Sequence, residues 1–496
     1  MTASTRTLAA LGLTARDGRE AAVTGIAVDS RGVRPGFLFA ALPGTAAHGA
    51  GYVPQALAAG AGVVLTDRAG EAQATSAIAA HDTPVALVVV EDARAALSGA
   101  ASLWFDAQPA HIVAVTGTSG KTSVASFTRQ IWQALGRSAI SLGTMGVEGD
   151  FTAKLAHTTP EPVTLHRILA DAAAAGISHC AMEASSHGLD QRRLDGVRLE
   201  AGAFTNFSQD HLDYHHDFES YFAAKALLFE RLLTEGQPAI INIDDPAGQR
   251  MAARAGKAGL ELLRIGRAEA ADLRILGQRY DATGQELRFS IHGKAHLVRL
   301  DLIGGFQAEN VLAAAALAMA SGEAADAVIG VLPDLTTVRG RMQLAARRAN
   351  GAAVFVDYSH KPGALASALQ SLRPHVMGRI LVVFGAGGDR DRLKRPLMGQ
   401  AARDHADLVI VTDDNPRTED PAAIRAAVMA GAGPEAIEVG DRAEAILRGV
   451  DALEAGDALL IAGKGHESGQ IIGHDVFPFD DAEQASVAVA ALEGRI

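Results

Sequence analysis

The chain has 496 residues, too many for one hydrophobic core, and at about 100–200 residues per domain this length predicts three or four domains. Its 45 lysines and arginines stand against 57 acidic residues, and the formal charge of −12 excludes a broad basic face for nucleic acid. The single cysteine, Cys180, excludes an internal disulfide framework, and the longest apolar run, 311–320, is too short to cross a bilayer, so we expect a cytoplasmic protein without membrane insertion.

Short β-branched runs alternate along the chain with stretches rich in alanine and leucine that are long enough for helices. This alternation is typical of an α/β fold with mostly parallel sheets covered by helices. We expect a first segment to end near residue 108 and a third to begin near residue 339. The predicted strands lie, in chain order, at 25–31, 37–44, 61–67, 85–92, 112–117, 138–144, 179–186, 201–208, 238–245, 353–360, 379–388, 407–415 and 458–467.

A glycine-rich turn stands between the predicted strand at 112–117 and a predicted helix. In such turns glycines let backbone N–H groups approach phosphate oxygens, a lysine neutralises the outer phosphates, and a hydroxyl can bind Mg²⁺. The spacing between the two glycines is shorter than in the usual loop, and a purely structural turn is the alternative. The predicted nucleotide-binding residues of this turn are Gly117, Thr118, Ser119, Gly120, Lys121, Thr122 and Ser123.

Two side chains that follow neighbouring strands are candidates for binding Mg²⁺. Glu183 lies in the strand end at 179–186, and His211 follows the strand at 201–208. Ligands of open parallel sheets bind beyond the carboxyl ends of the strands, so this carboxylate and this imidazole could both reach a metal that bridges phosphates. For a single residue of either kind, helix capping or a hydrogen bond in the core is the more common role.

Lys225 lies on a predicted helix at 218–233, on one stripe with aromatic residues at three-and-four spacing. Burial of this stripe would lower the pKa of the lysine, and a neutral amine can take up carbon dioxide as a carbamate. The alternative is a lysine whose stem packs on the stripe while its ammonium reaches water. The aromatic members of the stripe are Phe218, Tyr221, Phe222 and Phe229.

Several motifs occur in the order found in Mur ligases, from residue 29 to about residue 470, and they are TGTSGKTS, HTTPE, MEASSHGLDQRR, FTNFSQDHLDYH, DYSHKP, GAGGDRD, DDNPR and GKGHE. The chain resembles this family, and within it the members that add diaminopimelate, which carry the sequence DNPR. The resemblance implies a UDP-binding domain at 1–108, a central P-loop ATPase domain at 109–338 and a Rossmann-like domain that binds the amino acid at 339–496.

The resemblance also implies a reaction. ATP would phosphorylate the terminal carboxylate of UDP-N-acetylmuramoyl-L-alanyl-D-glutamate, and the amine of meso-diaminopimelate would attack the acyl phosphate, extending a peptidoglycan precursor. A carboxylate is a poor electrophile, so it needs such a leaving group. The implied cofactors are ATP, Mg²⁺ and CO₂, the last as a carbamate on Lys225, and we expect a monomer. The implied catalytic and metal-binding residues are Lys121, Thr122, Glu183, His211 and Lys225.

Binding residues for the three substrates follow from the same resemblance. Against the nucleotide it implies Asn310, Arg341, Asp357 and His360. For UDP, the sugar and the peptide it implies Val28, Ser30, Thr45, Ala46, Ala47, His157, Thr158, Thr159, Ser185, Gln191 and Arg193. For the incoming amino acid it implies Arg390, Asp414, Asn415, Pro416, Arg417, Gly463 and Glu467. The alternatives are an N-cap for Asn310, a surface charge for Arg341 and ordinary loop polarity at 357–360. For Arg193 the alternative is a solvated arginine, and for DDNPR it is a turn between a strand and a helix.

The side chain of diaminopimelate ends in a carboxylate and an ammonium. Arg417 can bind the carboxylate and Glu467 the ammonium, whereas L-lysine would leave the arginine unpaired. The alternatives are a lysine-adding or other ligase of this family, such as a folylpolyglutamate synthase, and a nucleotide-controlled binding module without ligase chemistry. The chain departs from the commoner family residues at His157, Gln209, Lys361 and the pair at 468–469.

Overall fold

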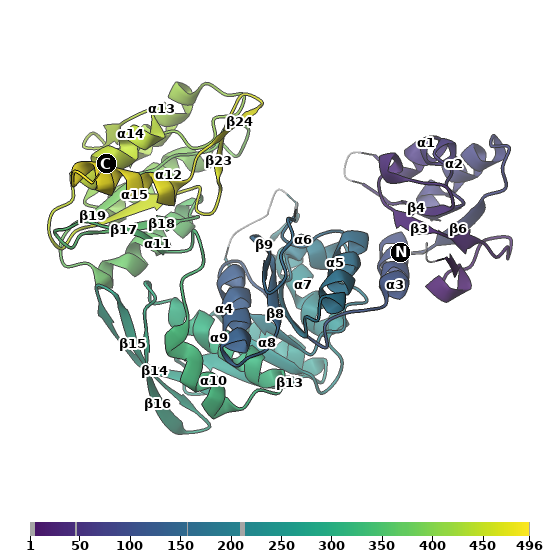
Figure 1. The fold of residues 1–496 in the computed structure, drawn as a ribbon, viewed down its shortest axis with the longest axis horizontal. Coiled ribbons are helices and arrows are strands. Elements are labelled where there is room, and N and C mark those ends of the chain that lie inside the picture. Colours follow the sequence, from purple (N-terminus) through teal and green to yellow (C-terminus); the bar gives the residue numbers. More distant parts are fainter. Residues whose placement is uncertain (1–4, 45–46, 156, 209–213, 496) are drawn as a thin grey trace. The chain divides into compact units, whose positions relative to one another are not determined.

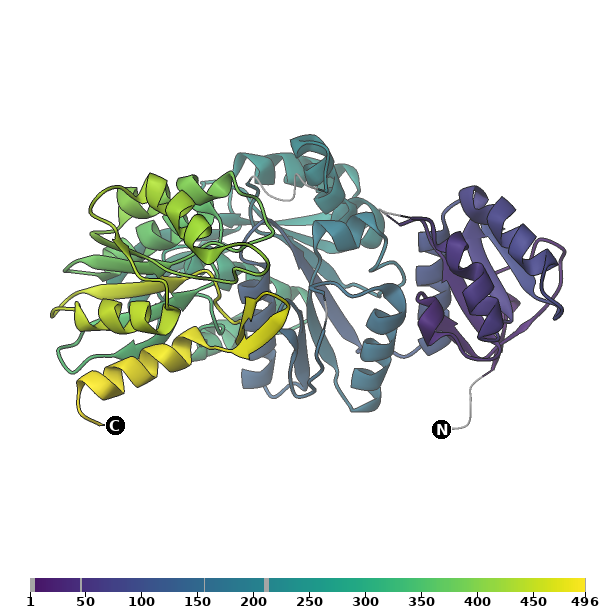
Figure 2. The ribbon, with the colours of Figure 1, turned by 90° about the horizontal axis from the view of Figure 1, so that it is seen from above.

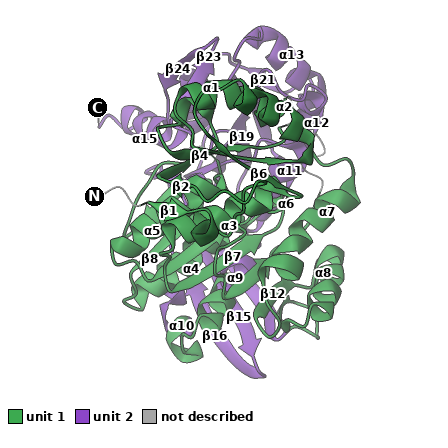
Figure 3. Cartoon of the chain, turned by 90° about the vertical axis from the view of Figure 1, so that its right-hand side faces the viewer, with its two compact units in different colours: residues 1–271, 313–328 green, residues 272–312, 329–496 purple. Residues whose placement is uncertain are grey.

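The computed structural model describes residues 5–44, 47–155, 157–208 and 214–495. The chain divides into two compact units, coloured separately in Figure 3. Unit 1 comprises residues 1–271 and 313–328, and unit 2 comprises residues 272–312 and 329–496. The three domain boundaries expected from the sequence, at 1–108, 109–338 and 339–496, stay a prediction.

Unit 1 begins with a short antiparallel pair, β1 (Arg6–Thr7) and β2 (Ala22–Val23). A four-stranded parallel sheet follows, drawn in purple in Figure 1. Helix α3 (Ala93–Phe105) packs on one face of this sheet, and helices α1 (Val53–Ala58) and α2 (Arg68–Ala79) pack on the other. Because both faces are covered, each strand reads as an apolar run in the sequence, which is why these strands were predicted. In sheet order they are β3 (Gly25–Ala27), β4 (Phe37–Ala41), β5 (Val63–Asp67) and β6 (Ala86–Val90).

A second sheet forms the centre of unit 1, and the order of its strands within this unit is β13-β12-β11-β7-β10-β8-β9. All neighbours described here are parallel except β9, which pairs antiparallel with β8 at the edge. Strand β7 lies between β10 and β11, so the loops that follow these three strands meet at one edge of the sheet. The strands are β7 (His111–Thr116), β8 (Ala139–Gly143), β9 (Gly146–Gly149), β10 (His179–Glu183), β11 (Ala201–Phe204), β12 (Pro238–Asn242) and β13 (Glu261–Gly266).

Helix α7 (Phe218–Leu227) carries Lys225 and continues as one π-helical turn, Leu228–Leu232. Asp217 accepts a hydrogen bond from Ser220 N, and Ser220 Oγ accepts one from Asp217 N, so this capping box fixes the start of the helix. The predicted aromatic stripe is buried except for Phe218, whose exposed fraction is 41%, because Phe218 lies in the first turn, where the helix leaves the core. The other helices around this sheet are α4 (Lys121–Ala134), α5 (Pro162–Ala174), α6 (Ser186–Asp190) and α8 (Pro246–Lys257).

Unit 2 contains a six-stranded sheet that is also covered by helices on both faces, with strand order β17-β18-β22-β19-β20-β21. Helices α11 (Pro362–Leu372), α12 (Lys394–His405) and α13 (Pro421–Ala432) pack on one face. Helices α14 (Arg442–Asp451) and α15 (Asp481–Leu492), the latter in yellow in Figure 2, pack on the other. The strands are β17 (Gln343–Arg347), β18 (Ala353–Asp357), β19 (Ile380–Phe384), β20 (Leu408–Val411), β21 (Ile437–Glu438) and β22 (Ala458–Ala462).

Three antiparallel elements of unit 2 were not predicted, and the first is the edge strand β17, which pairs with β18. The other two are longer. One is the meander β14 (Leu273–Asp281), β15 (Gly284–Ile291) and β16 (Lys294–Leu300), and the other is the hairpin β23 (Gly469–Ile472) and β24 (Asp475–Pro478). The apolar run 311–320 belongs to helix α9 (Gln307–Ala320), which precedes α10 (Ala325–Val331). Among the described residues, no helix is long and apolar enough to span a bilayer.

Candidate active site

The glycine-rich turn connects β7 to α4 as the sequence predicted. Gly117 has φ 148°, and a Cβ atom there would lie 1.9 Å from Thr205 Oγ1, so only glycine fits. Gly120, with φ 86°, immediately precedes the first helical residue, Lys121. Lys121 Nζ donates hydrogen bonds to Gly117 O at 2.9 Å and to Thr118 O at 3.0 Å. The ammonium therefore lies over the loop, where a phosphate-binding loop needs its positive charge.

The segment after β11 supports this turn from the side. Thr205 Oγ1 donates to Ser119 O at 2.6 Å, and Asn206 Oδ1 accepts from Ser119 N at 3.0 Å. Thr118 N also donates to Asn206 O at 3.0 Å. Thr205 and Asn206 lie within the predicted strand 201–208 and were not among the predicted nucleotide-binding residues, although polar residues at the end of a strand are a usable signal. The shape of the turn thus depends on a neighbouring strand end about 90 residues away.

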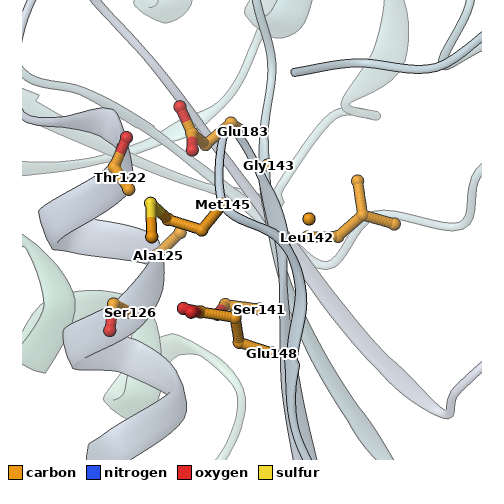
Figure 4. A pocket seen from close by; sticks show the side chains of 10 residues that line it. Thr122, Ala125, Ser126, Ser141, Leu142, Gly143, Met145, Glu148 and Glu183 are labelled. Carbon is orange, nitrogen blue, oxygen red and sulfur yellow. The ribbon is translucent and has the colours of Figure 1, made fainter. Parts of the chain in front are cut away.

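Glu183 and Thr122 line one small cavity of about 10 Å³, which Figure 4 shows between α4 and the ends of β8 and β10. Glu183 is buried, and its carboxylate accepts hydrogen bonds from Thr144 N at 2.8 Å and from Thr144 Oγ1 at 3.2 Å. A hydroxyl and a carboxylate are hard oxygen donors of the kind that Mg²⁺ prefers, so this donor set fits the metal that the family resemblance implies. His211, the third expected ligand, lies outside the described residues, and among those described no group of three acidic, histidine or cysteine side chains could hold a metal.

Lys225 lies beside the phosphate loop. Its side chain is 1% exposed, its Nζ donates to Gly117 O at 2.7 Å, and the ammonium lies 4.4 Å from the centroid of the Tyr221 ring. The alternative of an ammonium that reaches water does not describe this burial. Lys121 and Lys225 therefore donate hydrogen bonds to the same acceptor, Gly117 O. Formation of a carbamate on this amine stays a prediction.

The residues expected to bind the peptide lie next to Glu183. Thr158 Oγ1 is 3.1 Å from Thr144 Oγ1, which itself donates to the Glu183 carboxylate. Thr159 Oγ1 donates to Glu183 O at 2.9 Å and accepts from Ser185 N at 3.1 Å. A short chain of hydroxyl groups therefore joins the HTTPE segment to the predicted metal-binding carboxylate. His157 is exposed and belongs to no such contact.

The remaining predicted precursor-binding residues divide between the two sheets of unit 1. Ser30 is buried after β3, and its Oγ donates to Gln55 Oε1 at 2.8 Å, while Val28 packs partly against the first core. Thr45 and Ala46 lie outside the described residues, and so does Gln209; Ala47 is exposed. Gln191 and Arg193 follow α6, and Arg193 Nη2 donates to Gln191 Oε1 at 2.8 Å.

The residues expected to contact the nucleotide from outside the phosphate loop belong to unit 2. Asp357 ends β18, where burial raises the pKa of its carboxyl group and Met342 N donates to it at 2.8 Å. Arg341 lies 4.7 Å from the centroid of the Tyr358 ring. Burial lowers the pKa of His360 to about 4, so its imidazole is neutral at pH 7. Asn310 lies in the first turn of α9 and donates to Gln307 Oε1, which excludes the N-cap alternative.

The structure brings together most of the residues expected to bind the amino acid. Asn415 Nδ2 donates to Glu467 Oε2 at 2.9 Å, and Arg417 Nη1 donates to Gly388 O at 2.8 Å. At Gly463, φ is 115° and a Cβ atom would lie 2.5 Å from Asp414 Oδ2. Glycine at this position therefore lets the loop after β22 approach the loop after β20. Pro416 is buried within the DNPR turn, and Arg390 is exposed beside Gly387, which Arg417 also approaches.

Two buried cations behind these loops were not predicted as site residues. Lys464 is fully buried, and its Nζ donates to Asn415 Oδ1 at 3.0 Å and lies 3.4 Å from Glu467 Oε2. Arg442 donates two hydrogen bonds of 2.7 Å to Asp481, and both side chains are fully buried. Arg442 also donates to Asp413 O and Ala462 O, the backbone at the ends of β20 and β22. Lys464 and Arg442 therefore each connect the loop after β20 with the end of β22 and the loop that follows it.

We expect Asp481→Asn to lower the free energy of unfolding by about 3–5 kcal/mol, since it leaves the Arg442 guanidinium buried without its counter-charge. Burial opposes that charge, but the Asp481 carboxylate outweighs it and raises the pKa of Arg442. A urea titration followed by circular dichroism measures the change, with exposed Asp475→Asn as the matched control. A loss below about 1 kcal/mol would show that the pair contributes little to stability.

Comparisons with known proteins agree with this arrangement. The chain matches the Mur ligase family catalytic domain at residues 22–104, the Mur ligase middle domain at 115–318 and the Mur ligase glutamate ligase domain at 340–465. It is 49% identical to UDP-N-acetylmuramoyl-L-alanyl-D-glutamate–2,6-diaminopimelate ligases of Bradyrhizobium diazoefficiens, covering 95% of both chains, and of Agrobacterium fabrum, covering 95% and 94%. A solved structure of a ligase with that name aligns with TM-score 0.69 and 34% identity over 95% of both chains. The chain has the three-domain α/β architecture of the Mur ligases and belongs to the Mur ligase family.

Proposed function

We propose that this chain is an ATP-dependent ligase that adds meso-diaminopimelate to UDP-N-acetylmuramoyl-L-alanyl-D-glutamate, with release of ADP and phosphate. The relatives named above carry this activity in their names. The observation that carries the proposal is the chain of hydrogen-bonded groups from Thr158 through Thr144 to Glu183. Glu183 and Thr122 line the same small cavity. It would place the end of a peptide beside a phosphate-binding loop, where a carboxylate can be activated.

In the first step, an oxygen of the terminal carboxylate attacks the γ-phosphorus of ATP, and ADP leaves. Lys121 supplies positive charge to the transferred group, and the backbone of residues 117–120 holds the phosphates. Thr122 and Glu183 would bind Mg²⁺, which supplies charge neutralisation for the phosphates. Catalysis of this kind consists mostly of positioning and electrostatic stabilisation.

In the second step, the free amine attacks the acyl carbon and phosphate leaves with its bonding electron pair, so the amide forms and the amine loses a proton. The amino-acid loops of unit 2 supply the selection of the amine. Glu467 is oriented by Asn415 and Lys464, and the Arg417 guanidinium lies at the DNPR turn. We propose that Arg417 binds the distal carboxylate and Glu467 the distal ammonium, with Arg390, Asp414 and Gly463 completing the site.

We propose that Lys225 reacts with CO₂ to form N6-carboxylysine, which turns a cation into an anion beside the phosphate loop. Its burial supports this, since desolvation disfavours the charged form of an amine. The contact with Gly117 O places the amine beside the phosphate loop. We expect Lys225→Ala to lose about 100-fold or more in kcat, and acetate or formate to restore part of it by replacing the missing carboxylate.

The matched control for this rescue is Lys257→Ala, an exposed lysine on α8. It should keep the activity of the unaltered chain and show no response to acetate. If Lys225→Ala had full activity without added acetate or formate, the proposed carbamate on Lys225 would be refuted.

An assay of ADP formation with the UDP-linked dipeptide and a panel of amino acids tests the proposed function. We expect meso-diaminopimelate to support turnover and L-lysine to support it at least about 100-fold less well. Equal rates would favour the lysine-adding alternative, and absence of ADP formation with the full substrate set would favour a nucleotide-dependent binding module. Since the substrates are nucleotides and a nucleotide-linked precursor of peptidoglycan, we also propose that the protein acts in the cytoplasm, and as a monomer.

A further inference from the structure

Four arginines gather where the first sheet of unit 1 meets the loops of the second sheet. They are Arg94 on α3, Arg192 and Arg193 after α6, and Arg231 in the π-helical turn. Two of them are neutralised. Arg192 forms ion pairs with Asp92 at 2.5 Å and with Asp195 at 3.1 Å, and Arg231 pairs with Asp195 at 3.1 Å.

The other two arginines converge without a counter-charge. Arg94 Nη1 lies 3.5 Å and Arg193 Nη2 lies 2.8 Å from the same oxygen, Gln191 Oε1. Their remaining hydrogen bonds go to neutral carbonyl oxygens, from Arg94 to Pro43 O at 2.5 Å and from Arg193 to Thr159 O at 2.7 Å. Within the described part of the chain, no carboxylate lies at ion-pair distance from either guanidinium.

This arrangement is held in place by the chain itself. The backbone at Arg192 has φ 56°, and Arg192 O accepts a hydrogen bond from Ser98 Oγ of α3 at 2.6 Å. Gln191 Nε2 donates to Tyr214 OH at 3.1 Å, so its oxygen faces the two arginines. Burial lowers the pKa of Arg193, and the nearby charge of Arg94 lowers it further. Two like charges held together at such a cost are typical of a site for an anion.

We infer that Arg94 is a further substrate-binding residue, which together with Arg193 binds an anionic group of the UDP-linked precursor across the contact between the two sheets of unit 1. Arg94 also donates a hydrogen bond to Pro43 O, four positions before the predicted UDP-binding residue Ala47. The group bound is either the diphosphate or a carboxylate of the sugar-peptide part, because both offer paired anionic oxygens to guanidinium groups. The inference rests on the proposed function for the identity of the precursor.

Titration calorimetry of the full chain tests the inference without requiring catalysis. We expect Arg94→Met to raise the Kd of UDP-N-acetylmuramoyl-L-alanyl-D-glutamate by about 10- to 100-fold, the loss typical of a charged hydrogen bond. Arg94→Lys should recover part of this affinity. Arg19→Met, which removes a half-exposed arginine of the same unit, is the matched control and should bind as the unaltered chain does.

Ligand and salt series separate the possible causes. A weaker Kd for UDP as well identifies the diphosphate, and a loss confined to the full precursor identifies a carboxylate. The Kd of the unaltered chain should rise more steeply with salt than that of Arg94→Met, because salt screens the contact between Arg94 and the anionic group. If the variant lost affinity only because its hydrogen bond to Pro43 O is missing, the salt dependence would be unchanged.

Equal affinities of the Arg94→Met and unaltered chains, or a loss with unchanged salt dependence, would overturn the inference. An unaltered chain that fails to bind the precursor would instead refute the proposed function. Melting temperatures of all variants show whether each one is folded.

Discussion

Lys121→Met is expected to reduce kcat/KM for ATP by about a thousand-fold, the upper range for removing one donor that stabilises developing charge. The Lys121 ammonium donates hydrogen bonds to Gly117 O and Thr118 O, in the glycine-rich turn between β7 and α4. Methionine keeps the length of the side chain and removes the charge. The fall should appear mainly in kcat, since negative charge shifts towards the departing ADP only in the transition state, and Lys121 would stabilise that shift.

Steady-state kinetics with saturating precursor and amino acid measure this effect. Lys257→Met, an exposed lysine of the same unit, is the control for loss of one positive charge and should change kcat/KM by less than about two-fold. If Lys121→Met kept kcat within about ten-fold while remaining folded, the turn at 117–123 would have to be read as structural.

The second large effect concerns the choice of amino acid. We expect Arg417→Met to lower kcat/KM for meso-diaminopimelate by about 100- to 10,000-fold while leaving that for L-lysine unchanged or higher. The reason is that the variant would lose the paired contact between the Arg417 guanidinium and the distal carboxylate, whereas L-lysine has no distal carboxylate. Methionine is unbranched, so the left-handed backbone at this position, φ 53°, is no more strained than with arginine.

Rates with both amino acids, measured on the same preparation, give the change in preference directly. Arg403→Met, an exposed arginine on α12, is the matched control and should keep the preference of the unaltered chain. A parallel decline with both amino acids would mean that Arg417 supports the loop, through its contact with Gly388 O, and does not select the substrate.

The sequence predicted the parallel sheets well because their strands are covered on both faces. Strands such as β7 and β22 are buried at nearly every position and therefore appear as continuous apolar runs. The meander β14–β16 alternates buried and exposed residues and contains charged residues within each strand, so it gave no comparable signal. The hairpin β23–β24 is mostly exposed and was missed for the same reason.

The candidate site was predictable where chemistry is local in sequence and unpredictable where it depends on long-range contacts. The turn at 117–123 and the burial of Lys225 follow from spacing and periodicity. The neutralised and unneutralised arginines around Gln191 could not be told apart, because the contact of Arg94 with Gln191 joins residues 97 positions apart. Likewise, nothing in the sequence pairs Arg442 with Asp481, since that contact exists only when α14 and α15 pack on the sheet.

The most direct measurement of the proposed reaction is ADP formation with each substrate omitted in turn. Because ATP would be cleaved by the carboxylate of the precursor, ADP should appear only when the UDP-linked dipeptide is present, and with meso-diaminopimelate its amount should equal that of the new peptide bond. ADP released equally fast without the dipeptide would contradict carboxylate activation and, with it, the assignment of Thr158, Thr144 and Glu183 to one reaction centre.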